Sequence, residues 1–176
     1  MFQQDYFELF GLEQTFELDR DVLMHRYRDL QKATHPDKFA NGPEQERRIA
    51  LQRAGQINSA YQTLKDPLSR AQYLLSLSGV ESVLEQTTIR DIEFLEEQME
   101  LRETLADIRN DADPQGSIFH FLADLNKREK TYFNQLSKLL SNADEAALIQ
   151  ANDLTLRLQF VRRLQQEAEA VEEDFF

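Results

Sequence analysis

Residues 30–39 read Leu-Gln-Lys-Ala-Thr-His-Pro-Asp-Lys-Phe, and the helices expected on either side of this segment are organised around it. Proline disfavours the helical region for the residue before it, so we expect His35 to leave the helix. Pro36 has no backbone N–H to donate and is costly inside a helix. The tripeptide His35-Pro36-Asp37 therefore predicts an exposed, stiff corner at the C-terminal end of a helix.

The composition predicts an all-α protein of one or two domains. The chain has 176 residues, 41% hydrophobic and 30% charged, with only 5 Gly and 4 Pro. Because there is no Cys, disulfides, thiol catalysis and iron–sulfur ligation by this chain are excluded, and we expect a reducing, cytoplasmic compartment. No apolar run approaches the roughly 18 residues of a membrane span, so no membrane partner is expected.

The charge is distributed unevenly along the chain. The net charge is −12, and residues 1–79 carry 10 Lys or Arg against 11 Asp or Glu, whereas residues 80–176 carry 10 against 21. Such asymmetry predicts two units with different partners. An acidic chain is also a poor candidate for binding phosphate backbones, so we expect no nucleic-acid partner.

Helix signals in the first half predict a helical hairpin with a shorter helix before and after it. The expected helices cover residues 6–10, 20–33, 44–64 and 68–76. Asp5, Asp19 and Asp66 are suitable N-caps, and Gly11 suits a left-handed helix end. Residues 39–42 are expected to form a loop, with a cap at position 41 or 42 and Pro43 at the first helical position. This connection is long enough for an antiparallel hairpin.

The expected helix 20–33 has an apolar and a basic face. The apolar positions recur at helical spacing and predict a buried stripe of Leu23, Tyr27 and Leu30, with Val22 beside it. At 100° per residue, three basic side chains fall together on the opposite face, namely His25, Arg28 and Lys32. This basic face is either an ordinary solvated surface or a docking surface that leads to the corner.

Several motifs of residues 5–73 follow one another in a specific order. In chain order they are Tyr6, Leu9, Tyr27, His35-Pro36-Asp37-Lys38, Ile57-Asn58, Ala60-Tyr61, Leu64, Asp66-Pro67, Arg70-Ala71 and Tyr73. Together they resemble the J domain of DnaJ-type co-chaperones. The resemblance implies that the corner docks on a DnaK-type chaperone ATPase and stimulates its ATP hydrolysis. Arg28, Lys32 and Lys38 would offer a positive surface to an acidic patch of that chaperone.

The second half predicts a three-helix bundle. We expect residues 1–79 to form the first domain, 80–88 a connector and 89–176 the bundle. Its helices are expected at about 89–109, 117–140 and 143–173. Thr88 with Asp91 resembles a capping box, and residues 113–117 are expected to form a turn that ends at a cap on Ser117.

The expected helix 89–109 carries two apolar faces. One predicts a core contact and consists of Phe94, Leu101, Leu105 and Ile108. The other lies roughly 130° away; its apolar residues are Ile92, Leu95 and Met99, and the carboxylates beside them are Glu96, Glu100 and Glu103. Either the helix is wedged between two neighbours, or the second face is an apolar patch with an acidic rim that binds a partner.

The two later helices each show one apolar stripe. The helix at 117–140 is expected to turn Ile118, Leu122, Leu125, Tyr132, Leu136 and Leu139 to one side. The last helix is expected to turn inward Leu154, Leu158, Val161, Leu164 and Ala168. Leu156 and Phe160 lie off that stripe, so the Phe160 ring is either covered by a neighbouring helix or exposed for binding.

Further motifs extend the family resemblance. In the second half they are Arg90-Asp91, Phe94-Leu95, Glu97-Gln98 and Glu100-Leu101-Arg102-Glu103, and in the first half Phe10-Gly11-Leu12 and Leu74-Leu75-Ser76-Leu77 point the same way. With a J domain before them, they resemble the HscB family of iron–sulfur cluster assembly co-chaperones. The resemblance implies an HscA-like chaperone and an IscU-like scaffold protein as partners, and no cofactor. It also implies scaffold-binding positions at Leu95, Glu96, Met99, Glu100, Glu103 and Phe160, although Glu96 stands where an apolar residue is expected.

The corner itself has three chemical interpretations. A stable metal site needs three or four ligands, whereas His35 and Asp37 supply two and no Cys is available. A His–Asp pair can act as a base and its orienting group, but no Ser or Cys nucleophile is implied nearby. A recognition corner needs neither. We therefore expect no metal and no catalytic residue, and a co-chaperone adaptor rather than an enzyme; the alternative is a DnaJ-type adaptor for another client.

Overall fold

The computed structural model describes residues 5–39, 42–79, 92–141 and 144–175. Over these ranges the chain is helical and contains no strand, so the all-α prediction is confirmed. Its contacts divide the chain into two compact units, residues 1–74 and 75–176. None of the helices in the described ranges is long and apolar enough to cross a membrane.

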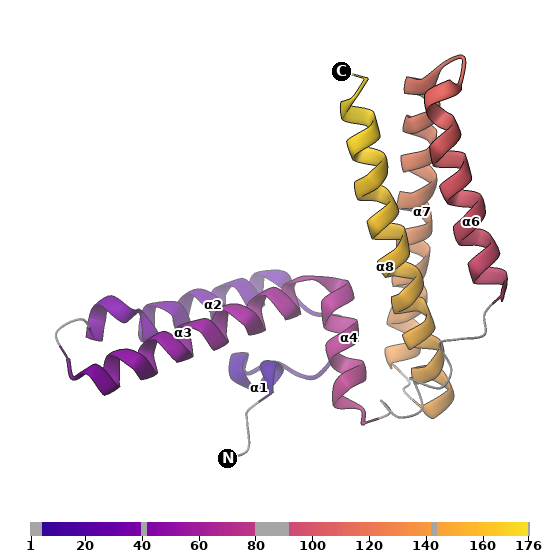
Figure 1. Cartoon of the computed structure of the whole chain (residues 1–176). Coiled ribbons are helices and arrows are strands. Elements are labelled where there is room, and N and C mark those ends of the chain that lie inside the picture. Colours follow the sequence, from indigo (N-terminus) through magenta and orange to yellow (C-terminus); the bar gives the residue numbers. More distant parts are fainter. Residues whose placement is uncertain (1–4, 40–41, 80–91, 142–143, 176) are drawn as a thin grey trace. The chain divides into compact units, whose positions relative to one another are not determined.

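The first unit is built on an antiparallel pair of helices, α2 (Arg20–Thr34) and α3 (Glu44–Lys65), shown in Figure 1. The short helix α1 (Tyr6–Phe10) precedes them, and α4 (Pro67–Leu77), whose last turn crosses the boundary after residue 74, follows. The expected caps are present: the Asp5 carboxylate accepts from the N–H groups of Phe7 and Glu8, and Gly11 ends α1 with φ 63°. Asp19 caps α2 in the same way.

Aromatic side chains fasten the hairpin. Tyr27 of α2 stacks on Tyr61 of α3 with ring centroids 4.0 Å apart, and its hydroxyl donates to the Asn58 side-chain oxygen at 2.6 Å. Beneath this pair lies a cluster of buried side chains, namely Phe7, Phe10, Leu23, Ile57, Ala60 and Leu64. Tyr6 of α1 also stacks on Tyr73 of α4, with centroids 4.5 Å apart, and both rings pack against the same cluster. The hairpin is therefore a stiff support for whatever lies at its tip.

The hairpin differs from the sequence prediction in three details. The connection after α2 is not a plain loop, because Pro36–Phe39 forms a 3-10 helix, η1. Pro43 is the N-cap of α3 rather than its first helical residue, and it supplies no side-chain cap. Val22 is 40% exposed, because the buried stripe centres on Leu23. The cap considered at Asn41 lies outside the described residues.

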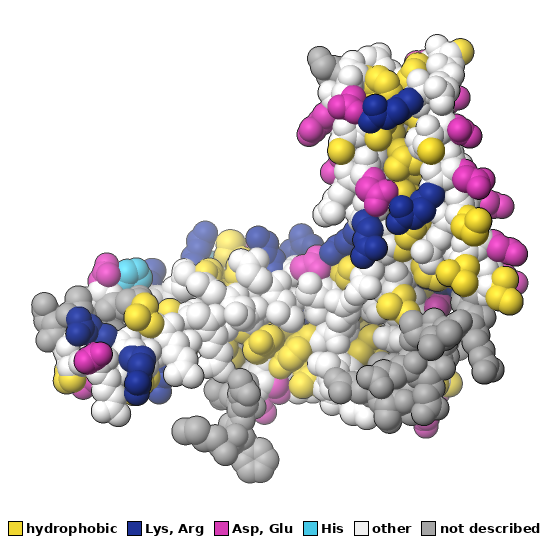
Figure 2. Space-filling view, in the orientation of Figure 1, with side chains coloured by type: hydrophobic (Ala, Val, Ile, Leu, Met, Phe, Trp, Pro, Cys, Tyr) yellow, Lys and Arg dark blue, Asp and Glu magenta, His cyan; other side chains and the backbone are white. Residues whose placement is uncertain are grey.

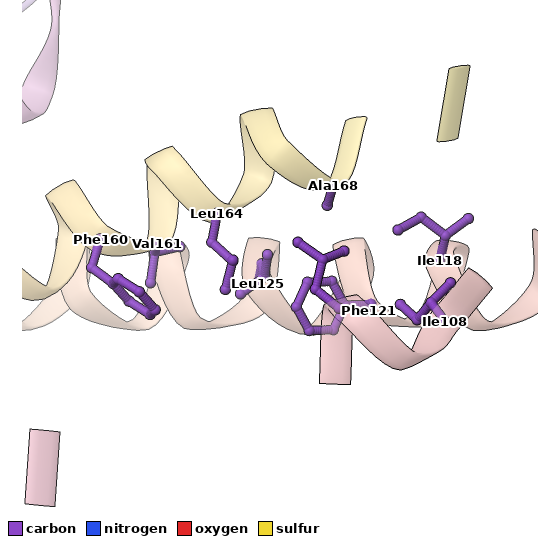
Figure 3. Close-up of a cluster of buried hydrophobic side chains, with 9 residues drawn as sticks. Ile108, Ile118, Phe121, Leu125, Phe160, Val161, Leu164 and Ala168 are labelled. Carbon is purple, nitrogen blue, oxygen red and sulfur yellow. The ribbon is translucent and has the colours of Figure 1, made fainter. Parts of the chain in front are cut away.

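The second unit is a bundle of three helices. Its elements are α6 (Ile92–Asp107) with the 3-10 turn η2 (Ile108–Asn110), α7 (Pro114–Ser141) and α8 (Glu145–Glu173). Figure 3 shows side chains from these helices meeting in one core, which contains Leu105, Ile108, Ile118, Phe121, Leu125, Phe160, Val161, Leu164 and Ala168. The predicted three-helix bundle is present.

One predicted boundary of the bundle is wrong, and another lies outside the described residues. Residues 113–117 are not a turn: α7 begins at Pro114, because proline suits a first helical position, and Asp113 Oδ1 accepts from the Gly116 N–H at 3.0 Å. The connector at 80–88 and the capping box at Thr88 and Asp91 are outside the described ranges. The predicted stripe of α7 also omitted Phe121, which is buried.

Candidate functional site

The corner at the end of α2 has the geometry that the sequence predicts. His35 is the C-cap of α2, with φ −56° and ψ 126°, so the backbone leaves the helix at the residue before Pro36. The chain turns at once into η1, where the Lys38 N–H donates to the His35 carbonyl at 3.0 Å. The side chains of His35 and Asp37 are 57% and 89% exposed. The corner is therefore rigid in its backbone and open to a partner.

The contacts of the imidazole fix which nitrogen is available. His35 Nδ1 accepts from the Asp37 backbone N–H at 3.2 Å, so in the neutral ring the proton is on Nε2. Nδ1 also lies 3.6 Å from Asp37 Oδ2, a contact that is attractive only when Nδ1 carries a proton. In the neutral form the corner offers an Nε2–H donor beside an exposed carboxylate. This pairing suits hydrogen-bonded recognition of another protein.

Basic side chains lead along α2 to the corner. Arg28, Lys32 and Lys38 are all exposed, as is His25. Figure 2 shows Lys and Arg side chains along the edge of the unit where α2 runs. Lys32 lies in the last turn of α2, where a cation is also favoured by the helix dipole. Within the described ranges no three His, Cys, Asp or Glu side chains are grouped so that they could hold a metal ion.

The second candidate site is an apolar patch on α6, defined here as Ile92, Leu95 and Met99. These side chains are 69%, 55% and 63% exposed, so the interpretation that places them between two neighbouring helices is wrong. The carboxylates on the same helix, Glu96, Glu100 and Glu103, are also exposed. Figure 2 shows acidic side chains along the edge formed by α6 and hydrophobic side chains gathered beside the lower part of that edge. The arrangement is an apolar patch with an acidic rim.

Phe160 does not share this exposure, and this part of the predicted site must be corrected. Its ring is 8% exposed and belongs to the bundle core (Figure 3). It packs edge to face on Phe94, with centroids 5.9 Å apart, while the Arg102 guanidinium lies over its ring at 5.7 Å. The neighbouring helix α6 thus covers the ring that lay off the predicted stripe. Phe160 can support the patch from the core but offers little surface for contact.

Sequence reasoning overlooked a cluster of charges behind the patch. Glu97 of α6 accepts hydrogen bonds from Arg128 of α7 and Arg157 of α8, and its side chain is only 27% exposed. A signal for this cluster was present in the sequence. Glu97 lies three residues after Phe94 and four before Leu101, so it falls on the inward face of an otherwise apolar stripe.

Each of the two units matches a known protein family. Residues 5–73 match the DnaJ domain family, and residues 90–169 match the family described as the HSCB C-terminal oligomerisation domain. A co-chaperone protein HscB homolog of Shewanella woodyi is 46% identical over 172 residues, which cover 98% of this chain and 99% of the relative. The solved structure of chaperone HscB from Vibrio cholerae superposes with a TM-score of 0.87 at 44% identity, covering 98% and 99% of the two chains.

A more distant solved structure shows the same fold. Human co-chaperone protein HscB superposes with a TM-score of 0.85 at 26% identity, covering 98% of this chain and 84% of that one. A DnaJ domain with a His-Pro-Asp corner at which His35 and Asp37 are exposed, followed by a helical bundle, defines a J-domain co-chaperone. With relatives this similar over its whole length, the chain belongs to the HscB family of co-chaperones.

Proposed function

We propose that this chain binds a DnaK-type chaperone ATPase through the corner at His35 and stimulates its ATP hydrolysis. It further binds an iron–sulfur cluster scaffold protein through the α6 patch, delivers the scaffold to the chaperone and so assists maturation of iron–sulfur proteins. The chaperone is HscA-like and the scaffold IscU-like. The observation that carries the proposal is the pairing, in one HscB-family chain, of an exposed corner on one unit with an exposed apolar patch on the other.

The corner supports a role in recognition rather than in chemistry. Stimulation of a partner's ATPase requires that the corner binds the hydrolysing conformation of the chaperone better than the resting one. Two features suit such a contact: the backbone is held by Pro36 and η1, and the exposed donor and acceptor are in fixed relation. Arg28, Lys32 and Lys38 contribute a positive surface that speeds encounter with an acidic partner. Acid–base chemistry then belongs to the chaperone.

The α6 patch supports a role in holding the scaffold. Exposed Leu95 and Met99 offer apolar anchors, and Glu96, Glu100 and Glu103 offer charges that orient a partner with a basic rim. Phe160 supports the patch from the bundle core, through its contact with Phe94. Holding the scaffold and the chaperone on one chain raises the effective concentration of one at the other.

The decisive experiment is the steady-state ATPase rate of a DnaK-type chaperone with this protein, measured with and without the scaffold. We expect stimulation by this protein alone and stronger stimulation when the scaffold is added. An unchanged ATPase rate in both mixtures would show that the corner does not act on that chaperone. Stimulation to which the scaffold adds nothing would favour the alternative, a DnaJ-type adaptor for another client, because the exposed patch fits another client equally well.

A further inference from the structure

The cluster behind the patch connects all three helices of the bundle through one carboxylate. Glu97 Oε1 accepts from an Arg128 guanidinium nitrogen, and Glu97 Oε2 accepts from an Arg157 guanidinium nitrogen at 3.4 Å. Each arginine also binds a carboxylate on its own helix: Arg128 Nε donates to Asp124 at 2.7 Å, and Arg157 Nε to Asp153 at 2.8 Å. Each guanidinium group is already held by a carboxylate on its own helix. Less side-chain conformational entropy is therefore lost when it binds Glu97.

In the described part of the chain, the segment of α6 that carries the patch is only partly buried. From Ile92 to Leu101 no side chain is buried, and the first buried residue of the helix is Leu105. The inward contacts of this first part are made by half-buried side chains. Phe94 packs on Phe160, and the Arg157 guanidinium lies 4.6 Å from the Phe94 ring centroid. With so little buried area here, a charge-assisted contact makes up a large share of what fixes the helix.

Position along the helix links Glu97 to the patch. Leu95 and Met99 each lie two residues from Glu97, and two residues correspond to about 200° of rotation. A contact that directs Glu97 toward α7 and α8 therefore directs Leu95 and Met99 away from them. The side-chain exposures agree: 27% for Glu97 against 55% and 63% for Leu95 and Met99.

We infer that Glu97, held by Arg128 and Arg157, is a positioning residue of the α6 patch. It sets the rotation of residues 92–101 and so presents Leu95 and Met99 to the partner without touching that partner. The inference rests on the proposed role of the patch in binding the scaffold. Its first readout, however, is measured on the free protein.

The test compares Glu97→Gln with Glu93→Gln in the full-length chain. Both variants remove one negative charge from α6, but Glu93 is exposed and has no ion pair among the described residues. In Glu97→Gln we expect amide hydrogen exchange over residues 92–101 to become about tenfold faster, because the local opening of the helix costs less free energy. Exchange around Leu105 and Ile108 should stay unchanged, as should exchange throughout Glu93→Gln.

The second readout is affinity for the scaffold by calorimetric titration. Glu97→Gln should weaken binding about tenfold, whereas Glu93→Gln should change it little. Arg128→Gln should reproduce both effects, and it serves if Glu97→Gln fails to fold. Weaker binding with unchanged exchange would mean that Glu97 touches the scaffold, which overturns the inference. Unchanged exchange and unchanged binding overturn it as well, and so does faster exchange with unchanged binding.

The same titration separates this inference from the proposed function. Leu95→Ala leaves the Glu97 cluster in place, so its exchange over residues 92–101 should match that of the natural sequence. If Leu95→Ala binds the scaffold normally, the patch is not the scaffold site and the proposed function fails at that point. If Leu95→Ala binds weakly and Glu97→Gln binds normally, the function stands and the positioning role fails.

Discussion

Phe94 on α6 and Phe160 on α8 pack edge to face, with ring centroids 5.9 Å apart and an interplanar angle of 90°. Through this pair the exposed patch is coupled to the core of the bundle, because Phe94 lies next to Leu95 in sequence but faces inward. Phe160 is therefore buried and Leu95 exposed, although the family resemblance assigns both to scaffold binding. Substitutions at the two positions should separate stability from contact.

Phe160→Ala should lower the free energy of unfolding by about 3 kcal/mol, because it removes a large buried ring and leaves a cavity. Scaffold affinity should fall as well, since α6 loses the support of Phe94. Urea unfolding followed by circular dichroism measures the first effect and calorimetry the second. Unchanged stability with a large loss of affinity would mean that the ring contacts the scaffold directly.

Leu95→Ala combined with Met99→Ala should weaken scaffold binding by about 2 kcal/mol, as expected for apolar anchors of an interface. Because both side chains are exposed, stability should change by no more than about 0.5 kcal/mol. The matched control is Phe119→Ala on α7, which removes a side chain that is 64% exposed and lies outside the patch. Calorimetric titration should show normal affinity for the control.

His35→Gln should abolish stimulation of the chaperone ATPase, because glutamine does not reproduce the Nε2–H donor at the position fixed by the Asp37 N–H contact. Scaffold affinity should be unaffected, since the patch lies on the other unit. Steady-state ATPase rates and calorimetry on the same preparation measure both. His120→Gln, an exposed histidine of α7, is the control. Loss of both activities in His35→Gln would contradict the division into two surfaces.

Arg28→Ala combined with Lys32→Ala should slow association with the chaperone about tenfold at low ionic strength, because positive charge on α2 speeds encounter with an acidic surface. The difference should shrink as salt screens the charges. Stopped-flow association rates over a salt series provide the measurement, and Lys127→Ala on α7 is a control of equal charge type. A deficit that is independent of salt would argue for direct contacts rather than steering.

Arg70→Ala should destabilise the first unit by about 2 kcal/mol. Its guanidinium is buried, donates to the Leu64 carbonyl at 2.7 Å near the end of α3, and lies over the Phe16 ring at 5.3 Å. Burial lowers the pKa of Arg70, with the Arg20 charge as the next cause, so its hydrogen bond to Leu64 stabilises a group that the fold desolvates. Thermal unfolding should show the loss, and exposed Arg53→Ala should not.

Most of the fold could be predicted from the sequence, because its signals lie between residues that are close along the chain. Caps at Asp5 and Asp19, the stop at Asp66-Pro67 and the apolar stripes around Leu23 and Leu125 depend on neighbours within a few positions. For the same reason the corner at His35 was predictable: the restriction that Pro36 places on its neighbour is covalent. The wrong boundary at Pro114 arose because a proline can end one element or begin another, and local sequence favours neither strongly.

The packing between helices determines which apolar side chains are buried, and helical periodicity alone does not show this. The sequence showed two apolar faces on α6 and an aromatic off the stripe of α8. Only the tertiary structure showed that α6 covers Phe160 with one face and leaves Leu95 and Met99 in solvent. Arg128 and Arg157 lie 31 and 60 positions after Glu97 in sequence, so their contacts with Glu97 depend on the placement of three helices. Helical periodicity gives the direction in which a side chain points from the axis of its helix. Whether that side chain is buried depends on what the other helices place in that direction.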